Sequence, residues 1–79
     1  MIRSTAKTLV TGATGLVGNN VVRALLDRGR AVRVMQRETS DPRPLSGLDV
    51  EIIHGDLRDS SSVHRAVEGC DLVIHAAAH

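Results

Sequence analysis

The stretch Val10-Thr11-Gly12-Ala13-Thr14-Gly15-Leu16-Val17-Gly18 decides the fold that this chain can adopt. It begins in a short β-branched and apolar run, residues 8–11, which is typical of a buried strand. Beyond its first glycines, apolar side chains recur at four-residue steps over residues 16–28, and this spacing predicts a helix with one apolar face. The stretch is therefore the turn between a strand and a helix, and its glycines need a physical reason.

The three glycines of this turn meet different needs. Gly12 permits a tight turn, Gly15 leaves room for a pyrophosphate, and Gly18 lets the helix pack closely on the sheet. The G-x-x-G-x-x-G spacing is one residue wider at its start than the common dinucleotide fingerprint, and no P-loop Lys follows. A glycine-rich turn without a ligand is the alternative. The candidate phosphate-binding residues are Gly12, Thr14, Gly15, Leu16, Val17 and Gly18.

The rest of the chain continues to alternate strands and helices. We expect strands at residues 31–35, 50–53 and 72–76, a second helix at residues 60–68, and a loop at residues 38–49 that could make one turn at residues 46–48. The order β-α-β-β-α-β predicts an α/β fold, a Rossmann-type parallel sheet with strand order 3-2-1-4. This is the N-terminal half of such a sheet, so we expect a truncated domain: a leader at residues 1–6 and a partial NAD(P)-binding domain at residues 7–79.

Composition argues against several classes of function. The 79-residue chain has a net charge of +1 with dispersed basic residues, which favours neither nucleic acid nor an anionic membrane as partner. It has no aromatic residue to stack on bases, and its apolar runs are too short to span a membrane. The single cysteine, Cys70, fits a reducing compartment, so we expect a cytoplasmic protein. Cys70, His75 and His79 lack the paired spacing of zinc ligands, so no metal site is predicted.

The end of the second strand bears on the choice of cofactor. NAD sites commonly place an acidic side chain there to accept from the ribose 2′-hydroxyl, but this chain has Gln36 followed by Arg37. A guanidinium can contact a 2′-phosphate with two hydrogen bonds, so the pair favours NADP over NAD. A solvated charge at Arg37 is the alternative, and Glu38 keeps NAD open if it reaches the ribose. Arg33, on the opposite strand face from its apolar neighbours, is expected at the surface.

Three motifs in order resemble the extended short-chain dehydrogenase/reductase family, which includes nucleotide-sugar epimerases, dehydratases and dihydroflavonol-reductase-like enzymes. Residues 11–18, T-G-A-T-G-L-V-G, resemble its phosphate loop. Residues 55–59, G-D-L-R-D, resemble its adenine-binding stretch, and residues 75–78, H-A-A-A, its H-x-A-A stretch beside the ribose and nicotinamide. The resemblance covers residues 7–79.

This resemblance implies roles for individual residues. Asp56 would accept a hydrogen bond from the adenine amino group, and Leu57 would supply backbone polarity and an apolar edge. Ala76, Ala77 and Ala78 would leave room where the cofactor crosses the strand ends. A turn-forming role for Asp56 and ordinary strand packing for the alanines are the alternatives.

The family's catalytic residues are missing from the sequence. Its chemistry uses a Tyr-x-x-x-Lys pair downstream of the fourth strand, whereas this chain has no Tyr and its only Lys, Lys7, precedes the first strand. We therefore predict no catalytic residue here, and expect the NADP(H)-binding portion of an oxidoreductase that reduces a carbonyl or oxidises an alcohol. The alternatives are an NAD-using nucleotide-sugar epimerase or dehydratase, and a non-enzymatic NADP-sensing module. The exposed edge of the fourth strand could also allow self-association.

Overall fold

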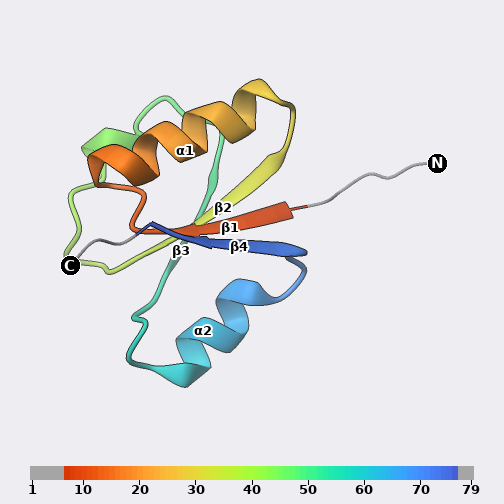
Figure 1. The fold of residues 1–79 in the computed structure, drawn as a ribbon. Coiled ribbons are helices and arrows are strands. Elements are labelled where there is room, and N and C mark those ends of the chain that lie inside the picture. The colour runs from red at the N-terminus through yellow and green to blue at the C-terminus, as the bar shows by residue number, and fades with distance from the viewer. Residues whose placement is uncertain (1–6, 77–79) are drawn as a thin grey trace.

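The computed structural model describes residues 7–76 of the chain, as a four-stranded parallel sheet with one helix packed on each face (Figure 1). Its elements are β1 (Lys7–Thr11), α1 (Leu16–Asp27), β2 (Ala31–Gln36), the 3-10 turn η1 (Arg43–Leu45), β3 (Glu51–His54), α2 (Ser60–Val67) and β4 (Leu72–His75). The strand order is β3-β2-β1-β4, which confirms the Rossmann-type fold and the order 3-2-1-4. The proposed leader, Ala77 and Ala78 lie outside the described residues.

The parallel register brings the carboxyl ends of all four strands to one edge of the sheet. Thr11 pairs with Met35 on one side and with His75 on the other, while Gln36 pairs with His54. The segments that leave these strands therefore start side by side. This edge is where open α/β sheets bind ligands.

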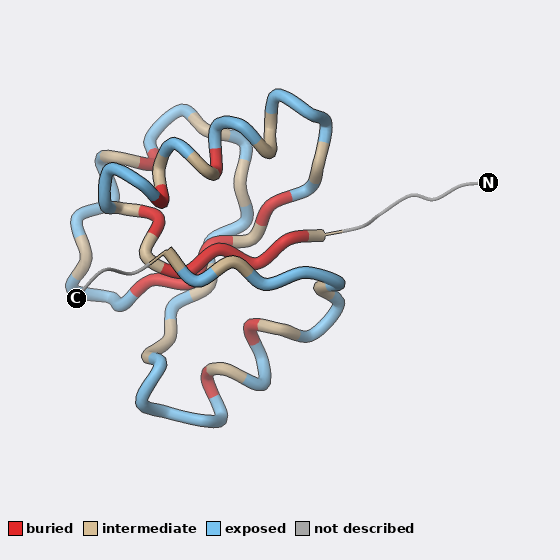
Figure 2. Tube along the Cα trace, in the orientation of Figure 1, coloured by how far each residue is buried: buried red, intermediate tan, exposed pale blue. Residues whose placement is uncertain are grey.

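The core has two layers because the sheet is covered on both faces. On the α1 face, Val10 and Val34 from the central strands pack with Val22 of the helix, and each of the three is 0% exposed. Under α2, Leu9 and Met35 from the central strands pack against Ala66. The central strands β1 and β2 are buried along most of their length, whereas the outer strands are largely exposed (Figure 2). The buried central strands thus fix the position of the carboxyl ends of the strands, where the ligand-binding edge lies.

Helix and strand boundaries differ from the sequence-based expectations by at most one residue, and the loop turn differs by three. The first helix ends at Asp27 rather than at residue 28, and Gly29 follows with φ of +76°, as a left-handed helix terminus requires. The turn in the long loop lies at Arg43–Leu45 rather than at residues 46–48. Prolines at positions 42 and 44 fix φ at its start, and Leu45 is buried in the core at its end.

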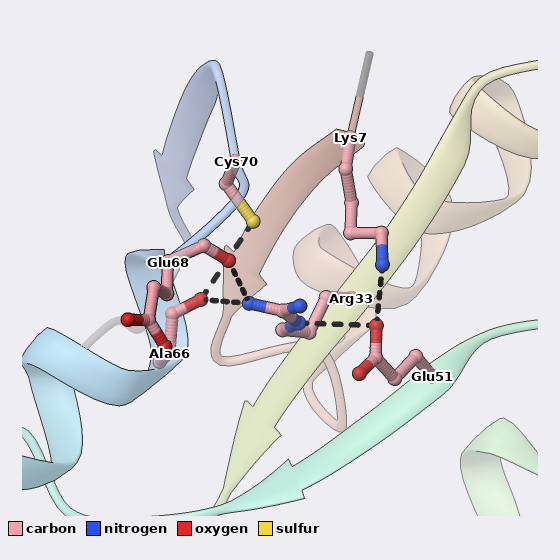
Figure 3. A network of polar contacts seen from close by, with 6 residues as sticks. All are labelled: Lys7, Arg33, Glu51, Ala66, Glu68 and Cys70. Carbon is pink, nitrogen blue, oxygen red and sulfur yellow. Dashed lines mark hydrogen bonds and ion pairs between the residues drawn. The ribbon is translucent and has the colours of Figure 1, made fainter. Parts of the chain in front are cut away.

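The expectation that Arg33 is a surface residue is wrong. Its side chain is only 11% exposed, and Nη1 donates to the carbonyls of Ala66 (2.7 Å) and Glu68 (2.6 Å) at the end of α2 (Figure 3). Its Nε donates to Glu51 on β3, which also accepts from Lys7 Nζ at 2.7 Å. Because carbonyls at a helix C-terminus lack partners within the helix, this guanidinium attaches α2 to the sheet. Within the described residues, no helix is long and apolar enough to cross a membrane.

Candidate functional site

The glycine turn between β1 and α1 has two glycines that the fold itself requires. Gly12 has φ of +76°, a conformation that side chains rarely adopt. A Cβ on Gly18 would lie 2.1 Å from the carbonyl oxygen of Gly12, so only glycine lets α1 approach the turn this closely. Gly15 is different, because the nearest atom to an added Cβ is 3.6 Å away and its φ of −79° and ψ of 168° are open to any residue. Packing therefore gives no reason for glycine at position 15.

The start of α1 is free of side-chain caps. Its N-cap residue is Gly15, no side chain among residues 7–76 accepts from the first turn, and that turn contains no acidic residue. Leu16 and Val17 are 80% and 65% exposed. The first N–H groups of a helix have no partner within it and lie at the positive end of its dipole, so this terminus can bind an anion through Leu16, Val17 and Gly18.

A cavity lies beside the glycine turn, where the ends of β1, β2 and β3 meet. It is lined by Thr11, Gly12, Ala13, Thr14, Met35, Gln36, Arg37, Ser40, Gly55, Asp56 and Leu57. Five of the candidate cofactor-binding residues thus share one cavity: Gly12, Thr14, Arg37, Asp56 and Leu57. The other described candidates lie outside its lining: Gly15, Leu16, Val17 and Gly18 lead from it into α1, and Ala76 follows β4, where its N–H donates to Thr11 O at 2.9 Å.

Gln36 brings an unsatisfied polar atom to this cavity. It is 9% exposed, on the same strand face as Val34, and its Oε1 is buried without a hydrogen-bond partner among the described residues. A buried acceptor without a donor costs about 1–3 kcal/mol, so such atoms need an explanation. A ligand in the cavity that carries hydroxyl or amino groups could supply the missing donor once the side chain turns toward it.

Asp56 is held by its neighbour in the sequence. Arg58 donates to it from the backbone N–H (2.9 Å to Oδ1), from Nε (3.1 Å to Oδ1) and from Nη2 (2.7 Å to Oδ2). The guanidinium hydrogen bonds, with the backbone N–H and then the charges of Arg58 and Arg37 adding to them, hold the pKa of the Asp56 carboxyl well below its usual range. Asp56 is therefore ionised and can only accept hydrogen bonds at neutral pH.

Arg37 keeps its charge available. It is exposed, lines the cavity, and forms no ion pair with any residue between 7 and 76. It also borders an adjoining hollow that contains Glu38, His54 and Arg58. A cation placed this way can receive an anionic group of a ligand.

Several features of the site were not foreseen from the sequence. They are the Gln36 oxygen, the Arg58 fork, the hydroxyl of Thr11 in hydrogen-bond contact with His75 Nδ1, and the tight fit of Gly55, where an added Cβ would lie 2.9 Å from the Cβ of Ser62. The D-x-R spacing of residues 56–58 could have indicated the fork, because an Asp commonly accepts from the backbone two residues on. The contact of Thr11 with His75 joins residues that are 64 positions apart in the sequence, so no local pattern indicates it.

A family model described as the NAD dependent epimerase/dehydratase family matches residues 8–79, and so includes the glycine turn and every strand end of this edge. The chain belongs to the NAD-dependent epimerase/dehydratase family. Members bind an NAD(P) dinucleotide, which agrees with the resemblance inferred from the three motifs. The cavity, the uncapped helix and the unpartnered amide oxygen are compatible with such a ligand.

Individual relatives support the same family. A sterol demethylase protein B of Methylococcus capsulatus is 55% identical over 71 residues, and a 3 beta-hydroxysteroid dehydrogenase/Delta 5-->4-isomerase of Mycobacterium tuberculosis is 40% identical over 74 residues. The chain covers 22% and 19% of these two proteins, and the matches cover 90% and 91% of the chain. The crystal structure of a nucleoside-diphosphate-sugar epimerase from Pseudomonas aeruginosa matches with a TM-score of 0.86 and 32% identity, over 92% of this chain and 24% of that one.

Proposed function

We propose that this chain is the NADP(H)-binding portion of an oxidoreductase that interconverts a carbonyl and an alcohol. The observation that carries the proposal is the cavity at the strand ends, which joins the glycine turn to Arg37 and to the oxygen of Gln36, neither of which has a partner within residues 7–76. When bound, the cofactor would supply a hydride to the substrate carbon or accept one from it. The domain would comprise residues 7–79, and the sole cysteine agrees with work in a reducing compartment such as the cytoplasm.

Different residues of the site would bind different parts of the dinucleotide. The N–H groups of Leu16, Val17 and Gly18 would hold the pyrophosphate at the start of α1, with Gly12, Thr14 and Gly15 shaping the turn against it. Asp56 would accept from the adenine amino group, and Leu57, 49% exposed, would cover an edge of the base. Ala76, Ala77 and Ala78 would leave room for the ribose and nicotinamide.

Charge favours NADP over NAD at the end of β2. A carboxylate there would repel a 2′-phosphate, whereas Gln36 is neutral and its amide can donate to a phosphate or accept from a hydroxyl. Arg37 would contact the phosphate directly, since its guanidinium is not engaged by any acid among residues 7–76. Glu38 lines the adjoining hollow and is not part of the cavity lining, which favours Arg37 over Glu38 as the residue that would contact the ribose.

The reductase and dehydrogenase chemistry is supported by one relative in particular. The Mycobacterium tuberculosis protein is named a hydroxysteroid dehydrogenase, which is an enzyme of alcohol and carbonyl groups. We assign no catalytic residue to this chain, because the proton donor that carbonyl reduction needs would come from a Tyr-x-x-x-Lys pair that residues 1–79 do not contain. The activity proposed is therefore that of the protein as a whole.

Separate titrations of the purified protein with NADPH and NADH test the proposal. We expect tighter binding of NADPH, and we expect Arg37→Ala to weaken NADPH binding by roughly tenfold or more while leaving NADH binding unchanged, since a hydrogen bond to a charged group contributes about 1.5–3 kcal/mol. Arg23→Ala, on the exposed face of α1, is the control. Tighter binding of NADH, or no effect of Arg37→Ala, would refute the cofactor assignment.

A further inference from the structure

The described chain contains two copies of one local device, a D-x-R fork. In each, an arginine two residues after an aspartate donates to its carboxylate from the backbone N–H, from Nε and from Nη2. Arg58 does so to Asp56, and Arg43 does so to Asp41 with distances of 3.0, 3.0 and 2.9 Å. Only the fork at Asp56 has its aspartate in the cavity lining; Asp41, in the connection between β2 and β3, is not part of that lining.

The fork at Asp56 contributes little to folding. The Arg58 side chain is 80% exposed and that of Asp56 is 32% exposed. Exposed ion pairs of this kind stabilise a protein by at most about 1 kcal/mol and often not measurably. What the fork does is geometric: a planar guanidinium bound to both carboxylate oxygens fixes the rotation of a side chain that could otherwise turn freely.

The orientation of the Asp56 carboxylate matters because a second cation, Arg37, lies in the same cavity lining. The positive charge of Arg37 already favours the ionised form of that carboxyl. Without Arg58, the Asp56 carboxylate would be free to turn toward Arg37 and pair with it. Such a pair would occupy both groups that the proposed function assigns to the nucleotide.

We propose that Arg58 is a positioning residue that holds the Asp56 carboxylate toward the adenine edge and keeps it from pairing with Arg37. This inference rests on the proposed function, because it presumes an adenine nucleotide in the cavity. Asp56 accepts a hydrogen bond from the exocyclic amino group only while Arg58 fixes the orientation of its carboxylate. The lone pairs not engaged by the fork are those left to accept from the base.

The test compares binding of NADPH with binding of its analogue in which hypoxanthine replaces adenine. Hypoxanthine carries a carbonyl oxygen in place of the exocyclic amino group, so at that position it offers Asp56 an acceptor instead of a donor. We expect the wild-type protein to bind the analogue about tenfold or more weakly than NADPH, from the loss of one hydrogen bond to a charged group. Arg58→Ala is expected to reduce this ratio to about threefold or less, whereas the matched control Arg43→Ala is expected to leave it unchanged.

Two further measurements separate the outcomes. Asp56→Asn should also reduce the ratio, and thermal unfolding should give the same midpoint for Arg58→Ala and Arg43→Ala, because both side chains are mostly exposed. A wild-type ratio in Arg58→Ala, alongside a reduced ratio in Asp56→Asn, overturns the role of Arg58 and leaves the proposed function intact. If the wild-type protein binds NADPH and the hypoxanthine analogue equally, Asp56 does not accept a hydrogen bond from the adenine amino group. A wild-type protein that binds no NADPH overturns the proposed function itself.

Discussion

Replacing Gly18 by alanine should destabilise the fold, because the added methyl group meets backbone that cannot move aside. Its Cβ would lie 2.1 Å from the oxygen, and 2.7 Å from the carbon, of the Gly12 carbonyl. Ordinary carbon contacts are about 3.5–4.0 Å, so α1 would have to shift away from the turn by roughly 1 Å. Overpacking costs about 1–3 kcal/mol, and the change from glycine to alanine within a helix returns about 0.5–1 kcal/mol. These ranges leave a net loss of up to about 2.5 kcal/mol in the free energy of unfolding, and because the obstructing atoms are backbone we expect about 1–2 kcal/mol.

Gly15→Ala is the matched variant, and it should behave in the opposite way. The nearest atom to its Cβ is 3.6 Å away and the backbone angles suit alanine. The free energy of unfolding should therefore change by less than about 1 kcal/mol, because the smaller entropy of the unfolded chain opposes the preference for glycine over alanine at an N-cap. Binding of NADPH should weaken by roughly tenfold, because the methyl group would stand where we propose that the pyrophosphate meets the backbone.

Urea unfolding and calorimetric titration with NADPH, carried out on both variants, separate the two effects. A lower urea midpoint with an unchanged slope is expected for Gly18→Ala alone. A wild-type midpoint for Gly18→Ala would show that the contact between the helix and the turn is not as tight as argued. If Gly15→Ala binds NADPH with wild-type affinity, the pyrophosphate does not lie against the backbone at this position.

Three other predictions concern the rest of the molecule. Arg33→Met should lower the free energy of unfolding by about 1–3 kcal/mol in urea, because the carbonyls at the end of α2 lose their donors, whereas Met in place of the exposed Arg65 should have no effect. The carboxyl pKa of Asp56, followed by NMR, should lie below its ordinary value of 3.8 and rise toward it in Arg58→Ala. Because folding lowers this pKa, the ionised carboxylate stabilises the fold above its unfolded-state pKa, and this stabilisation is lost as the pH falls through its folded-state pKa. The 79-residue polypeptide should self-associate through the edge of β4, so its mass from light scattering should rise with concentration, and Val73→Lys should abolish the rise; a monomer at all concentrations would contradict this.

The parts of the fold that the sequence predicted correctly depend on local spacing. The glycine turn, the four-residue steps of α1 and the β-branched runs are each contained within a short window, and the rules for parallel crossovers convert their order into the strand order β3-β2-β1-β4. The same reasoning brought Arg37 and Asp56 to one edge of the sheet, because each follows the end of a neighbouring parallel strand. That the two side chains line one cavity is a finding of the structure, because a cavity exists only once the surrounding side chains are placed.

The features that could not be predicted depend on residues distant in the sequence or on the absence of a hydrogen-bond partner. Arg33 bonds to the carbonyl of a residue 33 positions away, and no periodicity in β2 signals that a charged side chain there will be covered by the end of α2. The state of Gln36 is harder still, because an unsatisfied oxygen is recognised only when every neighbouring donor has been placed. Propensity placed the loop turn a few residues late because Leu45, which the core buries, decides where the chain bends inward.

The residues of the carboxyl edge divide by whether the fold explains them. Gly12, Gly18 and Gly55 are required by the protein's own geometry, since a side chain at any of them would be strained or would collide. Gly15 and Gln36 are not: the first has room for a methyl group, and the second buries an oxygen at a cost that a leucine or valine would avoid. Residue choices that folding leaves unexplained, gathered beside one cavity, are what a bound molecule would account for. For this reason the proposal of a dinucleotide depends more on Gly15 and Gln36 than on the glycines that make the turn recognisable.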